Sequence, residues 1–212
     1  MKGLPPTATT GEHVAYWALR AFAVLVCIFL VAPIFAIVPL SFSAGGFLHY
    51  PLPGLSLRWY REFFASPFWL PSLWNSLIVG SATTVLASAL GTLAALGLWR
   101  SKFWGSGVVM AVLIAPMIVP EIIVAVGIYF AFAPIGLTNS YTGLILSHTA
   151  LATPFVVVTV LATLSGFDRT LVRAASSLGA SALTTFRRVT LPLILPGIVS
   201  GALFAFAISF DE

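Results

Sequence analysis

Five long apolar runs limit how this chain can fold. They cover residues 21–40, 72–98, 105–133, 141–164 and 193–212. A helix of about twenty apolar residues crosses the hydrocarbon core of a bilayer. Of the 212 residues, 59% are hydrophobic and 8% are charged, whereas a soluble domain has about 25% charged residues. The sequence therefore predicts an all-α integral membrane protein, a helical bundle with five visible spans.

The stretches between these runs have distinct compositions. Residues 1–16 are polar and are expected to form a loose tail before a transmembrane domain over 17–212. Residues 41–71 are rich in Gly, Pro and aromatic side chains. Aromatic residues favour the headgroup layer, which predicts an outer loop with a short interfacial helix over 57–64.

Lysine and arginine fall unequally on the two sides of the predicted membrane. Cytoplasmic loops carry an excess of basic residues. With the N-terminus in the cytoplasm, Arg58 and Arg61 lie outside and the other eight basic residues lie inside. Those eight are Lys2, Arg20, Arg100, Lys102, Arg169, Arg173, Arg187 and Arg188. The bias predicts that the N-terminus and the loop over 165–192 are cytoplasmic. The basic residues flank apolar spans without interleaved aromatics, so lipid and not nucleic acid is the predicted contact.

One basic, amphipathic stretch over 165–192 interrupts the apolar sequence. Asp168 is predicted to cap a first short helix that Gly179 ends, and Ser181 to cap a second helix that Pro192 closes. Apolar residues recur there at steps of three or four, which places them on one helical face. They are Leu171, Ala174, Ala175, Leu178, Ala182, Phe186 and Val189. The pattern indicates a cytoplasmic helix–turn–helix whose apolar face needs a partner.

This stretch resembles the cytoplasmic loop of membrane permeases in binding-protein-dependent ABC importers. That loop carries Glu-Ala-Ala, a Gly four residues after the second Ala, and a hydrophobic-x-Leu-Pro ending ten residues beyond the Gly. Six residues fall in register with it: Ala174, Ala175, Gly179, Val189, Leu191 and Pro192. Arg173 stands where the family has Glu, which pairs with a basic residue of the ATPase subunit. The charge at that contact is therefore reversed.

The wider sequence is similar to the spermidine/putrescine branch of this family. The similarity is carried by LRWYREFF at 57–64, LIAPMIVPEII at 113–123, TFRRVTLPLILPG at 185–197 and FAISFDE at 206–212. It implies the fold of a type I ABC importer permease, multi-pass in a bacterial-type inner membrane, that moves a polyamine such as spermidine or putrescine inward by alternating access. Members of the family have a sixth span, which is expected to be missing from this sequence.

The resemblance also implies partners for the chain. Two ATPase subunits would hydrolyse ATP-Mg, a second permease subunit would complete the pathway, and an extracytoplasmic substrate-binding protein would deliver the solute. The loop would dock in a groove of an ATPase subunit. Its candidate coupling residues are Leu171, Arg173, Ala174, Ala175, Leu178, Gly179, Phe186, Val189, Leu191 and Pro192.

Catalytic motifs are absent from the sequence, which has no Walker A, HExxH, nucleophile elbow or dinucleotide fingerprint. The chain is therefore not predicted to be an enzyme or to bind a cofactor. His148 has no second ligand at i+3 or i+4, so it is expected to be a hydrogen-bonded packing residue and not a metal ligand. Acidic side chains within spans usually face the bundle interior or water. Glu121, Asp211 and Glu212 are accordingly expected to line a path for a cation.

Two other functions stay open on the residues alone. A stand-alone, ion-coupled secondary transporter or channel would use Glu121 as a proton or cation site and would need no ATPase. A membrane enzyme would use His148 and Glu121 as acid and base, without a nucleophile or metal.

Two stripes of small residues predict close contacts between helices. Small side chains let helix backbones approach in a membrane. One stripe, in the second span, is Ala87, Gly91 and Ala95, and the other, in the fifth span, is Gly197, Gly201, Ala205 and Ser209.

Overall fold

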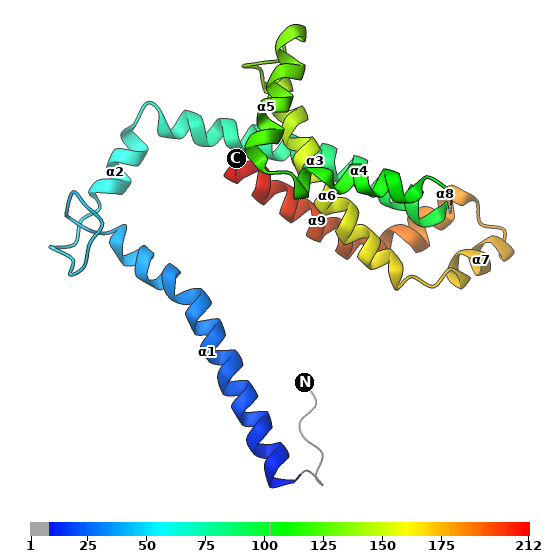
Figure 1. Ribbon diagram of the computed structural model, residues 1–212, viewed down its shortest axis with the longest axis horizontal. Coiled ribbons are helices and arrows are strands. Elements are labelled where there is room, and N and C mark those ends of the chain that lie inside the picture. The colour runs from blue at the N-terminus through cyan, green and yellow to red at the C-terminus, as the bar shows by residue number, and fades with distance from the viewer. Residues whose placement is uncertain (1–8, 102) are drawn as a thin grey trace. The chain divides into compact units, whose positions relative to one another are not determined.

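The computed structural model describes residues 9–101 and 103–212, and its regular elements are helices (Figure 1). These residues belong to two compact units, Met1–Leu70 and Pro71–Glu212. Four helices are long and apolar enough to cross a membrane, and a bent pair of shorter helices raises the number to five. The first eight residues of the predicted tail, and Lys102, lie outside the described residues.

The first unit contains α1 (Thr10–Leu40). The expectation of a loose tail over 1–16 is wrong from residue 10 onward, because a capping box starts the helix there. The Glu12 N–H donates to the Thr9 hydroxyl, and the Thr9 N–H donates to the Glu12 carboxylate at 2.7 Å. Capping of this kind satisfies N–H groups that lack partners in the first turn. The first predicted span, residues 21–40, is therefore part of a longer helix that begins at Thr10.

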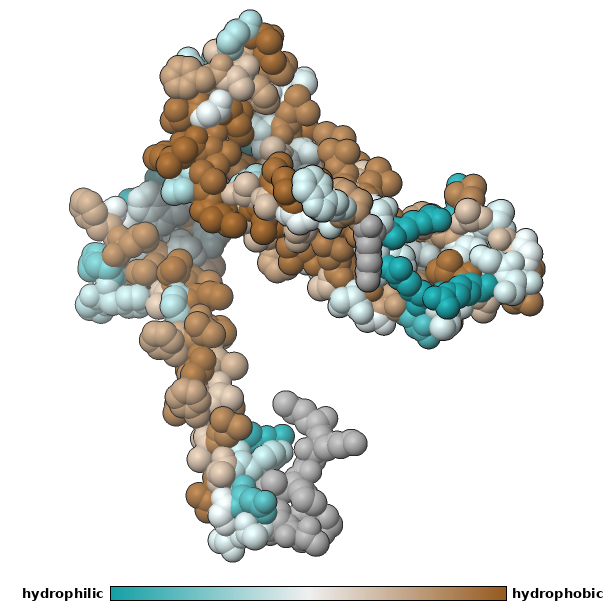
Figure 2. Space-filling model, turned by 45° about the vertical axis from the view of Figure 1, so that its right-hand side comes forward, coloured by the Kyte–Doolittle hydropathy of each residue, from teal (hydrophilic) through white to brown (hydrophobic). Residues whose placement is uncertain are grey.

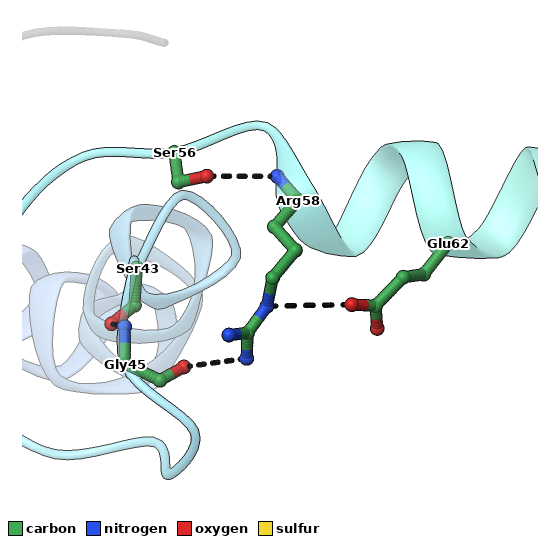
Figure 3. A network of polar contacts seen from close by, with 5 residues as sticks. All are labelled: Ser43, Gly45, Ser56, Arg58 and Glu62. Atoms are coloured by element: carbon green, nitrogen blue, oxygen red, sulfur yellow. Dashed lines mark hydrogen bonds and ion pairs between the residues drawn. The ribbon is translucent and has the colours of Figure 1, made fainter.

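The loop after α1 leads into the short helix α2 (Arg58–Ala65), where the sequence predicts an interfacial helix. Arg58 joins the loop to this helix (Figure 3). Its guanidinium donates to the Gly45 carbonyl at 3.2 Å and pairs with Glu62 at 3.4 Å, while its backbone N–H donates to the Ser56 hydroxyl. The loop is further closed by an antiparallel bridge between Ser43 and Leu55.

The second unit is built on α3 (Trp69–Arg100, from Pro71 onward), α6 (Tyr141–Ser165) and α9 (Leu191–Asp211). Their core joins side chains from all three helices. It consists of Ala87, Ala95, Ala152, Val156, Val160, Leu164, Ile194 and Ala205. All residues of the two small-residue stripes are buried. The close contacts predicted from these stripes are confirmed.

The reason for glycine is clearest where α6 meets its neighbours. A Cβ on Gly201 would lie 2.6 Å from the Thr159 hydroxyl, and a Cβ on Gly91 would lie 2.7 Å from the Val156 Cβ. Both separations are shorter than van der Waals contact. Helix α6 therefore packs between two glycine-bearing faces, one on α3 and one on α9.

The predicted third span is interrupted, as the prolines Pro116 and Pro120 within it indicate. It consists of α4 (Ser106–Ile118) and α5 (Glu121–Phe132), which meet at an angle of 108°, with a 3₁₀ turn (Ala133–Ile135) after them. Pro120 causes the break, because it restricts the residue before it to extended conformations. Val119 indeed has ψ of 134°. Glu121 consequently stands at the start of a helix, where the helix dipole favours a carboxylate.

Candidate functional site

The helix pair of residues 168–192 begins with a capped helix, α7 (Thr170–Ser177). The Asp168 carboxylate accepts the Thr170 N–H at 2.8 Å and the Thr170 hydroxyl at 2.7 Å. These hydrogen bonds hold the pKa of Asp168 below its ordinary value. Asp168 therefore satisfies the first N–H of α7, as predicted, although the residue at the N-cap position itself is Arg169.

The turn between the two helices depends on Gly179. This residue has φ of +78°, a left-handed conformation that only glycine adopts without strain. Its N–H donates to the Ser176 carbonyl, and the Ala180 N–H donates to the Ala175 carbonyl, which is a Schellman motif. Ser181 then caps α8 (Ala182–Thr185) by accepting the Thr184 N–H. The predicted helix–turn–helix is therefore confirmed.

The second helix does not end at Pro192. It passes through a π-helical segment (Phe186–Thr190) directly into α9, so that Ala182–Asp211 form one continuous rod. The prediction that Pro192 closes this helix is wrong. Pro192 lacks an N–H and would leave a carbonyl unpaired in the preceding turn, and the wider π turn lies at that place. Helix α8 is thereby continuous with the fifth predicted span.

The predicted apolar face divides between two surroundings. Leu171, Leu178 and Ala174 are exposed, and Leu178 is 88% exposed. Phe186, Val189 and Ala175 are half-buried against the rest of the unit. Leu183, which was not predicted from the sequence, adds a further exposed apolar side chain at 58%. The free apolar surface of the helix pair is thus centred on its three leucines.

Arginine and tryptophan anchor the helix pair to the end of α3. Arg169 lies over the Trp99 ring with its guanidinium carbon 4.4 Å from the ring centroid, and it donates to the Trp99 carbonyl at 2.5 Å. Phe167 packs edge-on against the same ring at 5.3 Å. Sequence reasoning missed this cluster. The available signal was an aromatic residue at the end of a span and another aromatic residue beside a loop arginine.

The candidate acidic residues lie near the other end of α6. The Glu121 and Glu212 carboxyl groups are close enough for their charges to interact. Glu212 also lines a cavity of about 270 Å³ together with Tyr129, Ser147 and His148. The His148 Nδ1 is 2.8 Å from the Ser209 hydroxyl, which confirms its predicted role as a hydrogen-bonded packing residue. Asp211 is exposed at the end of α9.

Polar and apolar surfaces are separated along the second unit. Hydrophilic surface gathers at the end that carries α7 and α8, whereas the long helices are mainly hydrophobic (Figure 2). Within the described residues, no group of three or more His, Cys, Asp or Glu side chains is placed to hold a metal ion. The notable features are therefore a free apolar helix pair at one end and neighbouring acids at the other.

Comparison with known proteins shows to which family this arrangement belongs. Residues 87–212 match the family described as the binding-protein-dependent transport system inner membrane component. The chain belongs to this family of membrane permeases. The matched residues include the helix pair and all three candidate acids. Because the family is an inner membrane component and the described residues hold several helices able to span a membrane, the permease is a multi-pass inner-membrane transport protein.

The curated relatives of the permease cover most of its length. It is 34% identical over 199 residues to the spermidine/putrescine transport system permease protein PotC of Haemophilus influenzae, over 93% of this chain and 76% of the relative. It is 31% identical to the putrescine transport system permease protein PotI of Escherichia coli K12, over 87% of this chain and 68% of the relative. The resemblance predicted from the sequence is confirmed at the level of the family.

A solved structure shares the fold of the permease. It is the crystal structure of a bacterial ABC transporter involved in the import of the acidic polysaccharide alginate. The match covers 97% of this chain and 74% of that chain, with a TM-score of 0.71 and 15% sequence identity. The all-α importer fold predicted from the sequence is thus confirmed, while the nature of the solute depends on other observations.

Proposed function

We propose that this permease moves a polyamine into the cell, driven by a separate ATPase that binds the helix pair of residues 168–192. The observation that carries this proposal is the exposure of Leu171, Leu178 and Leu183 on α7 and α8, on either side of the Gly179 turn. Apolar side chains in water are costly unless another surface covers them. Their position in an importer permease favours a partner subunit as that surface.

The partners follow from what this chain lacks and what its family does. Two ATPase subunits would bind and hydrolyse ATP-Mg, because the chain carries no nucleotide-binding motif. A second permease subunit would complete the pathway, and an extracytoplasmic binding protein would deliver the solute. This arrangement requires the N-terminus and the helix pair to be cytoplasmic, in agreement with the distribution of basic residues.

The unbroken helical path from α8 through the π segment into α9 supports a mechanical role for the helix pair. The ATPase would contact the pair mainly at Leu171 and Leu178. Phe186 and Val189 would hold the pair against its own unit, and Gly179 would set the angle between the helices. ATP-driven movement of the pair would then tilt α9 and switch the permease between inward-open and outward-open states. Coupling of this kind is reciprocal, so substrate binding would also change ATPase affinity.

The proposed polyamine substrate rests on similarity and on charge. The sequence is similar to the permeases named for spermidine and putrescine. The neighbouring carboxyl groups of Glu121 and Glu212 supply negative charge where a protonated amine needs it, and Asp211 precedes Glu212 at the end of α9. A site that brings like charges together becomes favourable when a cation lies between them.

Co-purification tests the coupling surface. The permease is expected to purify with its ATPase subunit, and Leu178→Asp is expected to lose that subunit. Ser177→Asp is the matched control, because it adds the same charge at the neighbouring exposed position of the same helix end without removing an apolar side chain. Equal ATPase yield from both variants would show that the ATPase does not bind through the leucine surface.

Transport into proteoliposomes tests the substrate. Uptake of labelled spermidine or putrescine is expected to require ATP and to fall in Glu121→Gln while the amount of permease in the membrane stays constant. Glu62→Gln in α2 is the control for a general loss of negative charge. Uptake without any ATPase, driven by an ion gradient, would instead support the secondary transporter.

A further inference from the structure

A cavity of about 410 Å³ lies between the end of α3, α7 and the α8–π segment. Its walls combine apolar side chains with three arginines that come from separate parts of the sequence. The lining includes Leu96, Trp99, Arg100, Arg169, Arg173 and Phe186. The three leucines of the proposed coupling surface, Leu171, Leu178 and Leu183, are not among its walls, whereas the candidate coupling residues Arg173 and Phe186 are.

The charge in this cavity is one-sided. Arg100, Arg169 and Arg173 line it, and no acidic residue of the described chain does. Asp168 is close enough to Arg173 for the two charges to attract each other, but both carboxylate oxygens of Asp168 already accept hydrogen bonds from Thr170. The ion pair found within the described residues is Arg58 with Glu62, in the other unit. Three arginines that share a space without a bound acid favour an anion there.

One of the three guanidinium groups is fixed in place. Stacking on Trp99 and the hydrogen bond to the Trp99 carbonyl hold Arg169, and they leave part of its fork of N–H donors free. Arginine presents its donors in a plane that matches two oxygens of a phosphate. A group ordered in advance loses less entropy when it binds. The cavity therefore has the chemistry of a phosphate site.

The cavity lies at the level where a span leaves the hydrocarbon core. Trp99 and Arg100 end the long helix α3, and tryptophan and arginine are typical of the headgroup layer. Leu96 lines the cavity, and Leu93, one turn earlier on α3, is 66% exposed. Residues three apart share a helix face. An apolar track thus runs from the arginines toward the middle of the bilayer.

We propose that this cavity binds the phosphate of an anionic lipid headgroup from the leaflet that surrounds the end of α3. Arg169 and Arg173 hold the phosphate oxygens, Arg100 adds charge from α3, and one acyl chain follows Leu96 and Leu93. The lipid thereby joins the helix pair to α3 at the base of the coupling loop. A free phosphate would use the arginines but not the apolar track, which is why a lipid fits the cavity better.

Native mass spectrometry of the whole 212-residue chain tests this site. The protein is purified in detergent micelles that contain phosphatidylglycerol or phosphatidylcholine with the same acyl chains. We expect phosphatidylglycerol to be retained preferentially, and Arg100→Gln and Arg173→Gln each to weaken its apparent affinity about fivefold, the effect of one basic residue near an anionic membrane. Arg187→Gln, a loop arginine outside the cavity, is the matched control and should leave retention unchanged.

Several outcomes would overturn the lipid site. Unchanged retention in Arg173→Gln would remove the cavity from lipid binding, and an equal loss in Arg187→Gln would reduce the effect to general surface charge. Displacement of the lipid by millimolar inorganic phosphate, with equal binding of phosphate alone, would assign the cavity to a soluble anion. Arg173→Lys keeps the charge and covers the case in which a glutamine variant misfolds: it should retain more lipid than Arg173→Gln if both fold. These measurements involve no transport, so their failure leaves the proposed import unaffected.

Discussion

Arg169 closes the open end of α3 by donating to the carbonyl of Trp99, 70 residues earlier in the chain, while its guanidinium stacks on the Trp99 ring at 4.4 Å. The last four carbonyls of a helix have no partner inside the helix. Arg169 satisfies one of them and supplies a cation where the helix dipole favours positive charge. The start of the helix pair is thereby attached to a second span, in addition to its covalent links with α6 and α9.

Removal of this anchor should loosen the base of α7. In Arg169→Ala, the loss of an exposed cation–π contact worth about 1 kcal/mol should speed amide exchange over residues 166–172 about fivefold. Arg169→Lys keeps the charge but not the planar stacking, so its exchange should be intermediate. Hydrogen–deuterium exchange measures this directly.

Arg188→Ala serves as the control for the anchor, because it removes an exposed loop arginine that has no contact with Trp99. Exchange over 166–172 that is the same in Arg169→Ala and the unsubstituted permease would mean that the stacked pair does not hold α7.

Two glycines of α3 should respond oppositely to the same substitution. A Cβ at Gly91 would lie 2.7 Å from the Val156 Cβ, whereas a Cβ at Gly97 meets nothing within 4 Å. Gly91→Ala should therefore destabilise the permease by about 1 to 3 kcal/mol through overpacking. Gly97→Ala should be neutral or stabilising by up to about 1 kcal/mol, because alanine favours helix. Thermal unfolding in detergent compares the pair, and a similar midpoint for both would show that α3 and α6 are not in close contact.

Local signals in the sequence predicted much of the helix pair and of the core. Asp168, Gly179 and Ser181 each act on backbone groups within a few residues, so their roles could be deduced from the order of residues. The small-residue stripes also follow from helical periodicity. Features of this kind are determined by short-range geometry.

The features that sequence reasoning missed depend on tertiary contacts or on the choice between two allowed backbones. The prolines of the third span predict an interruption, but the sequence does not give the 108° angle at Pro120. Pro192 in turn is accommodated by a π segment, where a helix end is predicted. The contact between Arg169 and Trp99 joins residues 70 apart in the sequence, and no local sequence pattern predicts it. The same holds for the proximity of Glu121 and Glu212.

Acid should weaken the N-terminal cap of α7. Hydrogen bonds from Thr170 hold the pKa of Asp168 below its ordinary value of 3.8 in the folded chain. A depressed pKa means that the ionised carboxylate stabilises the fold above the unfolded pKa, and that this contribution is lost as pH falls through the folded pKa. Amide protection of Thr170 and Leu171 should therefore be constant at neutral pH and should fall below about pH 4.

Asp168→Asn separates charge from hydrogen bonding in this cap. Asparagine can still accept the Thr170 N–H but does not titrate, so its protection of α7 should no longer depend on pH in the acidic range. If the unsubstituted permease and Asp168→Asn lose protection at the same pH, another group is responsible for the acid response.

Gly179 should be the most sensitive position of the turn between α7 and α8. Its φ of +78° would cost an alanine roughly 1 to 2 kcal/mol, because the Cβ crowds the following carbonyl in the left-handed conformation. No atom lies within 4 Å of the added Cβ, so the cost arises from the backbone and not from packing. Gly166→Ala is the matched control: Gly166 also ends a helix in this loop, but with φ of −88°. We expect Gly179→Ala to increase amide exchange at position 179 and at Ala180, whose N–H groups form the Schellman motif, and to reduce the yield of co-purified ATPase. Gly166→Ala should leave both unchanged. A loss of ATPase without faster exchange would instead place Gly179 in the contact itself, since an intact turn would then present a side chain that the partner cannot accommodate.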